Sequence, residues 1–307
     1  MFKKILLILL VILILLAGSL FFVFRFNLTH SVNSSNANVS FEVFAGQSKT
    51  EIAQSLKNKD LIKSKWAFIY YSVSHNKSLK PGIYYLKQNM NTLEIIDLIA
   101  SGKVQEHKIT TIEGWRNSEI ADYLIKNSII TNKEAFLKAA NGKEGYLFPD
   151  TYRLSLDVTP EEIVKLMTDN YNKRTNDLNV SKDDLILASI IERESANDEQ
   201  RYNVSGVYKN RMKIGMKLES SPTVSYAKNN WVEPTITDTK LIDSPYNTYK
   251  YAGFPPGPIC SPGLASIKAA QKPATHDYYY FINTKDGQLI MAKTLNEHNA
   301  NVSKYLK

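Results

Sequence analysis

The chain has 307 residues, of which 43% are hydrophobic and 22% are charged, and its formal net charge is +8. A chain of this length and composition can fold into about two globular domains, which excludes a largely disordered protein. No repeat with a period of roughly 20 to 50 residues is visible, so a solenoid is excluded as well. The positive charge suits an anionic neighbour such as membrane lipid, nucleic acid or cell-wall polymer, although an ordinary lysine-rich surface explains it equally well.

An uncharged apolar run occupies residues 5–24. As a helix it would be about 30 Å long, which is enough to cross the hydrocarbon core of a bilayer. Lys3 and Lys4 precede the run and Arg25 alone follows it closely, so the positive-inside rule predicts a cytoplasmic N-terminus. A cleaved signal peptide is the alternative, but the run is long for a signal and no small-residue cleavage site follows it. The sequence therefore predicts a single-pass protein of the cell membrane, in which the part of the chain after Arg25 lies outside the cytoplasm and meets no nucleic acid.

A linker is predicted at residues 25–38, because most of this stretch is polar, rich in serine and asparagine, and has little to bury. A small α+β module is predicted over residues 39–105. Ser48 and Asn91 are each followed three residues later by a glutamate, which is the capping-box pattern of a helix start, and Gly102 suits a helix end. Strands are expected at 39–44 and 82–86, and helices after Ser48, Ser64 and Asn91.

Residues 106–307 are predicted to form a larger mixed α+β domain. Its expected strands are 106–114, 278–283 and 289–292, and its expected helices are 118–126, 133–140, 160–175, 182–196, 204–215 and one at the C-terminus. Residues 144–154 are interpreted as an aromatic-rich loop. Five prolines and three glycines in residues 244–263 predict a rigid loop of the kind that often forms one wall of a site.

Most familiar catalytic patterns are missing from the sequence. The five histidines are scattered, and there is no H-E-x-x-H, P-loop or G-x-S-x-G pattern. Metal, nucleotide and serine-hydrolase chemistries are therefore not indicated, and no cofactor is expected. Cys260 is the one cysteine of the chain, so no intramolecular disulfide can form.

One carboxylate stands where a helix should bury an apolar side chain. Leu187, Ile190 and Ile191 share a helical face with Glu194, at the spacing i, i+3, i+4 and i+7. Burial disfavours the ionised form, so Glu194 should have a raised pKa and suit a general acid. The alternative is a glutamate whose head reaches solvent or a buried arginine. Glu192 leaves the helix about 160° away by the 3.6-residue period, where an exposed salt bridge is expected.

Several segments together are specific enough to suggest a family. They are EGYLFPDTY at 144–152, LASIIERES at 187–195, NRMKIGMKLESSPTVSYA at 210–227, SPYNTYKYAGFPPGPICSPG at 244–263 and EHN at 297–299. With them the chain resembles the YceG-like, or MltG, family of endolytic murein lytic transglycosylases. The resemblance implies that residues 39–105 are LysM-like and that the second glutamate of the E-[KR]-E triplet, Glu194, is the catalytic acid.

The resemblance also implies a reaction. The family cleaves the β-1,4 bond between N-acetylmuramic acid and N-acetylglucosamine within nascent peptidoglycan strands, leaves 1,6-anhydro ends and consumes no water. Such cleavage would terminate strand elongation, and peptidoglycan synthases (penicillin-binding proteins) are the expected partners. Two alternatives stay open, a muramidase that adds water and a non-catalytic scaffold that holds glycan for synthases.

Further polar and aromatic residues of these segments suit a sugar cleft, although each could equally hold a loop in place. The predicted substrate-binding residues are Tyr146, Asp150, Tyr152, Asn210, Arg211, Asn247 and Tyr249. The chain departs from the family pattern where Gln, Asp and His are usual, with Glu219, Ser221 and Leu289 in their places. These three positions are therefore not expected to be indispensable to the chemistry.

Overall fold

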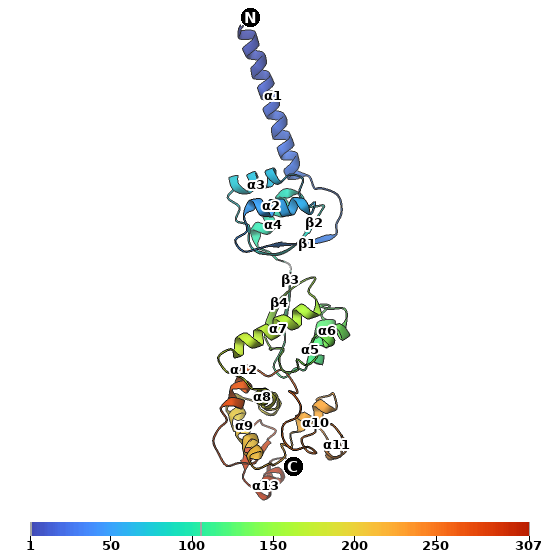
Figure 1. Cartoon of the computed structure of the whole chain (residues 1–307), viewed down its shortest axis with the longest axis vertical. Coiled ribbons are helices and arrows are strands. Elements are labelled where there is room, and N and C mark those ends of the chain that lie inside the picture. The colour runs from blue at the N-terminus through green and yellow to red at the C-terminus, as the bar shows by residue number, and fades with distance from the viewer. Residues whose placement is uncertain (1, 105, 307) are drawn as a thin grey trace. The chain divides into compact units, whose positions relative to one another are not determined.

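The computed structural model describes residues 2–104 and 106–306. The chain divides into two compact units, Met1–Glu106 and His107–Lys307, and the elements of each are labelled in Figure 1. The mixture of helices with short strands confirms the α+β prediction.

In the first unit the elements are α1 (Phe2–Thr29), β1 (Asn38–Val43), α2 (Lys49–Asn58), α3 (Lys65–Ser74), β2 (Gly82–Lys87), α4 (Thr92–Ser101) and the start of β3 (Glu106–Thr110). In the second they are α5 (Asn117–Lys126), α6 (Lys133–Ala139), β4 (Thr151–Ser155), α7 (Pro160–Thr175), α8 (Lys182–Glu194), α9 (Asp198–Lys213), α10 (Ser221–Ala227), α11 (Ile236–Leu241), α12 (Leu264–Gln271), β5 (Tyr280–Asn283), β6 (Leu289–Ala292) and α13 (Leu295–Tyr305).

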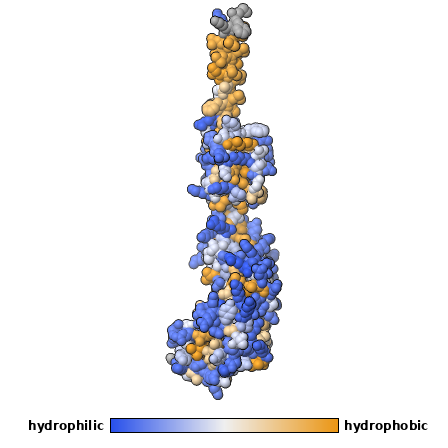
Figure 2. Space-filling view, turned by 90° about the vertical axis from the view of Figure 1, so that its left-hand side faces the viewer, coloured by the Kyte–Doolittle hydropathy of each residue, from blue (hydrophilic) through white to orange (hydrophobic). Residues whose placement is uncertain are grey.

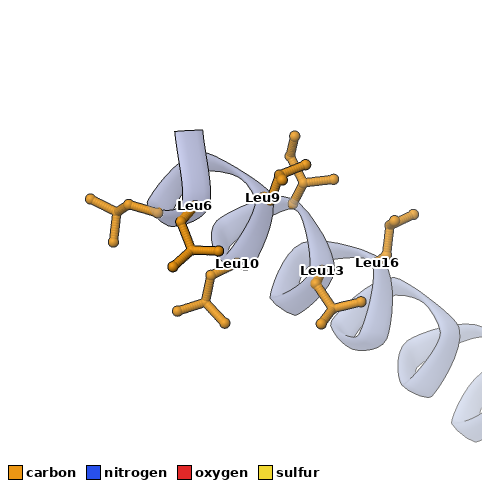
Figure 3. A pocket seen from close by; sticks show the side chains of 7 residues that line it. Leu6, Leu9, Leu10, Leu13 and Leu16 are labelled. Carbon is orange, nitrogen blue, oxygen red and sulfur yellow. The ribbon is translucent and has the colours of Figure 1, made fainter. Parts of the chain in front are cut away.

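Helix α1 carries the apolar run and is long and apolar enough to cross a membrane over residues 4–29. A signal sequence near the N-terminus would pass the same test of length and composition. Leucine side chains project from the helix around a shallow hollow that has few polar atoms (Figure 3). Figure 2 shows hydrophobic side chains over the visible face of the helix. The exposed leucines offer no group for chemistry, and they suit a hydrocarbon surrounding.

The end of α1 is folded onto the module, so the predicted linker is wrong for its first residues. The helix continues through Thr29, and Leu28 is only 1% exposed. Thr92 Oγ1 donates a hydrogen bond of 3.0 Å to the carbonyl oxygen of Asn27. Further on, the backbone N–H of Asn89 donates to the carbonyl oxygen of Ser35 at 3.0 Å. Polar composition alone suggested a free coil, but these contacts tie the segment to the module.

The module has one apolar core between a two-stranded sheet and three helices, two of which, α2 and α3, lie in the connection between the strands. Strands β1 and β2 pair antiparallel from Asn38 opposite Lys87 to Val43 opposite Gly82. Helices α2 and α4 start with the predicted capping boxes, and α4 ends at Gly102 in the left-handed conformation with φ of 69°. The core residues include Phe41, Leu56, Phe68, Tyr84 and Ile95.

The first core of the second unit lies among β3, β4 and helices α5 to α7, and includes Ile109, Ile120, Phe136, Tyr152 and Met167. The segment 144–154, predicted as a loop, ends in strand β4, where burial alternates along the five residues. Gly145 in this segment has φ of +84°, and a Cβ there would lie 2.6 Å from Cβ of Pro258. Any other residue at position 145 would therefore have a strained backbone, and its Cβ would clash with Pro258.

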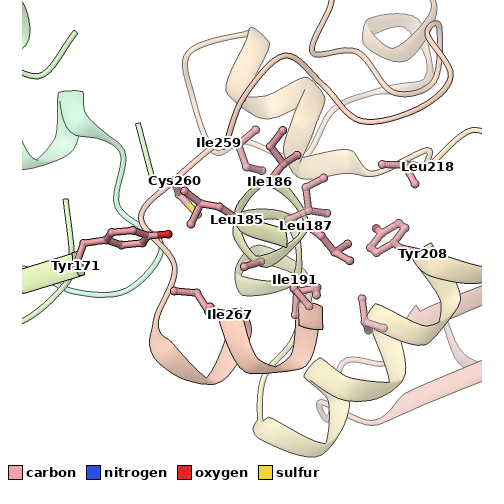
Figure 4. Close-up of a cluster of buried hydrophobic side chains, with 14 of the residues drawn as sticks. Tyr171, Leu185, Ile186, Leu187, Ile191, Tyr208, Leu218, Ile259, Cys260 and Ile267 are labelled. Atoms are coloured by element: carbon pink, nitrogen blue, oxygen red, sulfur yellow. The ribbon is translucent and has the colours of Figure 1, made fainter. Parts of the chain in front are cut away.

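The second core surrounds α8, whose residues Leu185–Ile191 are all buried (Figure 4). Helices α9 and α12 pack against it, and the backbone N–H of Ile259 donates to Ser189 Oγ at 3.0 Å. Helix α9 starts at Asp198, six residues before its predicted start, because Asn197 caps it. Helices α10, α11 and α12 have six to eight residues each and were not predicted. The middle of α8 is therefore enclosed by the core, and Glu194 in its last turn lines a cavity.

Candidate active site

A polar cavity of about 350 Å³ opens at the C-terminal end of α8. Its wall comes from α8, α9, the start of α10 and the segment just before it, the segments on either side of α11, β5 and the part of the chain from α13 onward. The lining residues are Glu194, Tyr208, Arg211, Glu219, Ser221, Glu233, Tyr249, Tyr280, Phe281, Ile282, Asn283, Leu295, His298 and Leu306. Across residues 2–104 and 106–306, no group of three or more His, Cys, Asp or Glu side chains is placed to hold a metal ion.

Glu194 is the last residue of α8 and lines this cavity. Tyr208 donates a hydrogen bond to its Oε1 at 3.0 Å, and Ser220 Oγ donates to the same oxygen at 2.8 Å. Asn283 Nδ2 donates to the carbonyl oxygen of Glu194 at 2.8 Å, which fixes the backbone of the last helical turn. Both side-chain donors meet Oε1, so a proton on this carboxyl group would sit on Oε2.

Burial raises the pKa of Glu194 above its ordinary value. The hydrogen bonds from Ser220 and Tyr208 stabilise the carboxylate and oppose the rise, as does the nearby charge of Arg211, whereas Glu233 adds to it. Desolvation is the largest of these effects, so the protonated form persists to higher pH than in water. A carboxyl group of this kind holds its proton more tightly than a free glutamate does, and it can give that proton up and take one back during a reaction.

Tyr208 is the buried donor of the pair, on helix α9 and only 1% exposed. Burial, together with the charge of Glu194, raises the pKa of its hydroxyl well above the ordinary value. Tyr208 therefore remains neutral and keeps its proton for the hydrogen bond to Glu194. Its ring meets that of Phe281 edge to face, with 5.9 Å between centroids, which orients the hydroxyl.

Arg211 and Glu219 bring further charge to the cavity. Arg211 donates through Nε to the carbonyl oxygen of Tyr279 at 2.6 Å and through Nη1 to that of Leu218, so its guanidinium is held rigidly. Glu219 has φ of +50°, a conformation uncommon for a residue with a side chain, and its Oε2 lies 3.8 Å from Arg211 Nη1. Backbone strain of this kind gathers at functional sites.

Of the seven predicted substrate-binding residues, Arg211 and Tyr249 line the cavity with Glu194. The hydroxyl of Tyr249 lies 3.3 Å from Ser221 Oγ. Glu219 and Ser221, where the chain departs from the family pattern, line it too. The proline-rich segment 244–263 contributes Tyr249 alone to this cavity, and its later residues pack into the core against α8.

Asp150 and Tyr152 lie away from the cavity and hold the fold. Asp150 Oδ2 accepts hydrogen bonds from Asn170 at 3.1 Å and from Arg174 at 2.6 Å. Tyr152 is 5% exposed, and its hydroxyl donates to the carbonyl oxygen of Phe148. Their polar groups are occupied by the protein itself, so the binding role expected from their composition has no support in their position.

Asn210, Asn247 and Tyr146 are also outside the cavity. Asn210 Nδ2 donates to the carbonyl oxygens of His276 and Tyr278. Asn247 is fully buried, and its Nδ2 donates hydrogen bonds to the carbonyl oxygens of Thr239 and Ile242. The ring of Tyr146 packs edge to face against Tyr171, with 5.2 Å between centroids. These three side chains stabilise loops and helix contacts, the other role that the sequence left open.

Glu192 forms a salt bridge as expected, but the expectation that it would be exposed is wrong. Its side chain is 6% exposed and pairs with Arg201, with 3.2 Å between Oε1 and Nη2. Its Oε2 accepts hydrogen bonds from the backbone N–H of Gly263 at 2.9 Å and from Ser266 Oγ at 2.7 Å. The face of α8 opposite Glu194 is covered by α12 and α9, so Glu192 joins three elements in a buried network.

Sequence reasoning missed Tyr208, Ser220 and Glu233 as neighbours of Glu194. One signal was available for Tyr208, which shares a helical face with Val204 and Arg211 at i, i+4 and i+7. A tyrosine on a buried face needs a partner for its hydroxyl. Ser220 and Glu233 carry no comparable local pattern.

A second polar pocket of about 470 Å³ lies around Glu144. The backbone N–H of Asn117 donates to Glu144 Oε1 at 3.0 Å, and Tyr226 donates weakly to Oε2 at 3.4 Å. Burial raises the pKa of Glu144 to about 7 despite these donors. Oδ1 of Asn117 is buried and has no hydrogen-bond partner among the described residues. Glu144 belongs to the EGYLFPDTY segment, and its pocket is distinct from the cavity at Glu194.

Comparison with known proteins shows the family to which this chain belongs. The model of the YceG-like family matches residues 41–304. An endolytic murein transglycosylase of Bacillus subtilis is 32% identical, over 89% of this chain and 86% of the relative. One of Streptococcus pneumoniae is 27% identical, over 89% of this chain and 59% of the relative. A crystal structure of a YceG-like protein of Listeria monocytogenes aligns with a TM-score of 0.53 at 31% identity, covering 87% of this chain and 99% of that one. With a family match over most of its length and a relative above 30% identity, this chain belongs to the YceG-like family.

Proposed function

We propose that this protein is an endolytic murein transglycosylase in which Glu194 acts first as the acid and then as the base. The observation that carries the proposal is the desolvated carboxyl group of Glu194, at the cavity and with Oε1 already occupied by two hydroxyl donors. The names of the relatives from Bacillus subtilis and Streptococcus pneumoniae support the same activity.

One carboxyl group suffices for this reaction. Protonated Glu194 gives its proton to the glycosidic oxygen as the bond from that oxygen to C1 of N-acetylmuramic acid breaks. The resulting carboxylate then takes the proton of the C6 hydroxyl of the same sugar, whose oxygen forms a new bond to C1. The products are a free hydroxyl on N-acetylglucosamine and a 1,6-anhydro end, and Glu194 is protonated again. The nucleophile is intramolecular, so holding the ring near its attack geometry supplies much of the rate.

Hydrogen bonding at the carboxyl group supports both halves of this cycle. Tyr208 and Ser220 donate to Oε1 and stabilise the carboxylate while it waits for the second proton. Burial destabilises that carboxylate and makes it a stronger base than in water. Arg211 is held by backbone carbonyl oxygens beside the cavity, which suits an anionic or acetamido group of the glycan.

Product analysis tests the proposal directly. Purified peptidoglycan digested by the protein should yield muropeptides with anhydro ends, each lighter by one water than the hydrolysis product in mass spectrometry. Glu194→Gln keeps the shape but removes the transferable proton, so it should yield neither product. Reducing ends in place of anhydro ends would refute the transglycosylase assignment.

A hydrolase is the second candidate, because Glu219 and Glu233 line the same cavity as Glu194. Common glycosidases use two carboxyl groups, and one of these residues would activate a water. Under that mechanism Glu219→Gln or Glu233→Gln would abolish turnover as Glu194→Gln does. Under the transglycosylase mechanism both variants keep the anhydro product.

We further propose that α1 is an uncleaved anchor with a cytoplasmic N-terminus, since Lys3 and Lys4 precede its apolar run and Arg25 follows it. The cavity then works outside the cytoplasm on newly made strands, close to the synthases that extend them, and its cuts end strand elongation. The LysM-like character of residues 39–105 is part of this proposal, as a grip on glycan or as a spacer.

A further inference from the structure

Helix α3 of the first unit has two different faces. Phe68 and Ser72 are fully buried in the module. On the other side Trp66 is 70% exposed, Tyr70 64% and Val73 60%, at the spacing i, i+4 and i+7 of one helical stripe. Single exposed apolar residues are ordinary, but a continuous apolar stripe marks an interaction surface. We call Trp66, Tyr70 and Val73 the α3 stripe.

The α3 stripe continues the apolar surface of α1. The ring of Tyr70 meets that of Phe24 edge to face, with 5.3 Å between centroids. Trp66 and Tyr70 line one groove together with Leu20 and other residues of α1. Figure 1 shows α3 beside the end of α1 that enters the module. Whatever surrounds the outer end of α1 therefore also meets the α3 stripe.

The position of Phe24 sets the depth of that contact. Phe24 is the last residue of the apolar run 5–24, and Arg25 follows it. In a helix that spans the bilayer, Phe24 lies at the boundary between hydrocarbon and headgroups. Trp66 and Tyr70 are then at headgroup depth, where tryptophan and tyrosine are enriched because each has an apolar ring and a polar group.

Positive charge lies beside the α3 stripe. Lys65 Nζ is 5.3 Å from the centroid of the Trp66 ring, and Lys63 Nζ is 5.2 Å from that of Phe26. Long lysine side chains can cover apolar surface and still place their ammonium groups at anionic headgroups. Aromatic rings flanked by lysines are typical of helices that lie in a membrane interface.

We infer that α3 lies in the headgroup layer of an anionic bilayer, with the α3 stripe toward the lipid and Lys63 and Lys65 at the phosphates. The inference rests on the proposed anchor α1. It gives the module two attachments to one membrane, the spanning helix and the interfacial helix. Two attachments restrict how the module rotates and tilts about α1, which a single flexible tether would not do.

Lipid quenching of Trp66 fluorescence tests the inference on the full chain. The protein is placed in nanodiscs of phosphatidylglycerol and phosphatidylethanolamine whose acyl chains carry bromine near the headgroup end. The chain has 3 tryptophans, and the difference between the native protein and Trp66→Phe isolates the emission of Trp66. We expect Trp66 to lose most of its emission in brominated lipid, and more than with bromine near the chain ends.

Matched variants show whether the quenching of Trp66 depends on the α3 stripe or changes whenever an exposed apolar side chain is removed. Tyr70→Ser with Val73→Ser should reduce the quenching of Trp66, whereas Phe44→Ser removes an aromatic ring that is 59% exposed but outside the groove and should leave it unchanged. Circular dichroism confirms that each variant is folded. If brominated lipid does not quench Trp66 while the protein remains in the nanodisc, α3 does not lie in the headgroup layer, although α1 is still an anchor. If alkaline carbonate releases the protein from the membrane, α1 is not a spanning anchor, and the inference about α3 is refuted together with it.

Discussion

Glu194 and Glu192 are two residues apart on α8, yet they differ in what they touch. Glu194 faces a cavity and two hydroxyl groups, whereas Glu192 is tied to Arg201, Ser266 and the backbone N–H of Gly263. We therefore expect opposite effects from the same substitution. Glu194→Gln should lower turnover at least about a hundredfold, as loss of a general acid does, with little change in Tm. Release of anhydro-muropeptides and thermal unfolding measure the two effects.

The matched variant is Glu192→Gln. It weakens a buried charge-assisted network and should reduce the free energy of unfolding by about 1–3 kcal/mol while leaving the turnover of folded enzyme near normal. Equal loss of turnover in both variants at a temperature where both are folded would contradict the assignment of the acid to Glu194.

The hydroxyl of Tyr208 should set the pH at which activity declines. The reaction starts from protonated Glu194, so activity falls as pH rises through the pKa of that carboxyl group. The hydrogen bond from Tyr208 lowers this pKa. Tyr208→Phe should therefore move the basic limb of the pH profile for kcat/KM to higher pH. Tyr249→Phe is the control, since Tyr249 lines the cavity but its hydroxyl lies against Ser221 Oγ, at 3.3 Å, and not against Glu194. An unmoved limb in Tyr208→Phe would argue against Glu194 as the titrating acid.

Glu144 should make folding stability depend on pH. Burial raises its pKa to about 7, so the folded state holds this proton more tightly than the unfolded state. The resulting stabilisation is complete below the unfolded pKa and is lost as pH rises through about 7, by about 3 kcal/mol at most. Urea unfolding at pH 5 and pH 8 should show a smaller difference for Glu144→Gln than for the native chain. The exposed Glu134→Gln is the control, and identical pH dependence in all three proteins would refute the expectation.

Helix α1 has an exposed apolar part and an end that packs inside the first unit. Its exposed leucines suit lipid, but Leu28 near its end is 1% exposed within the first unit. Leu28→Ala should lower the free energy of unfolding of this unit by about 2–5 kcal/mol, the range for a buried leucine. Hydrogen exchange of the backbone amides of α4, which packs against α1, reports the loss of protection. Phe44→Ala, at an exposed position, should have little effect, and equal protection in both variants would show that α1 does not support the module.

At the scale of the whole molecule, the anchor should matter for location and not for chemistry. Replacing residues 5–24 with a cleavable secretion signal keeps Arg25 and the buried Leu28 in place. The released protein should digest isolated peptidoglycan at the normal rate but fail to shorten strands in cells that lack the native protein. An unrelated spanning helix at the same position should restore strand length. Full restoration of strand length by the released form would contradict this prediction, because it would show that shortening strands in the cell does not require membrane location.

The sequence alone determined the features that depend on neighbours along the chain. The capping pairs Ser48–Glu51 and Asn91–Glu94 and the left-handed Gly102 are where their spacing predicts them. The helical phase also brought attention to Glu194, since one glutamate among apolar residues is visible in a single turn. Such signals need only a few residues, because caps and periodicity act within one or two turns of a helix.

Only the tertiary structure decided what each polar side chain meets. Tyr208 and Ser220 reach Glu194 from 14 and 26 residues away, and Ser266 reaches Glu192 from 74 residues away. A helix pattern gives the direction in which a side chain leaves, but not whether another element covers that side, which is why Glu192 was expected in solvent. The same reason applies to the segment after Arg25, whose polar composition suggested a free coil. Its carbonyl oxygens accept hydrogen bonds from α4 and from the turn after β2, and such long-range pairs form only when the elements pack together.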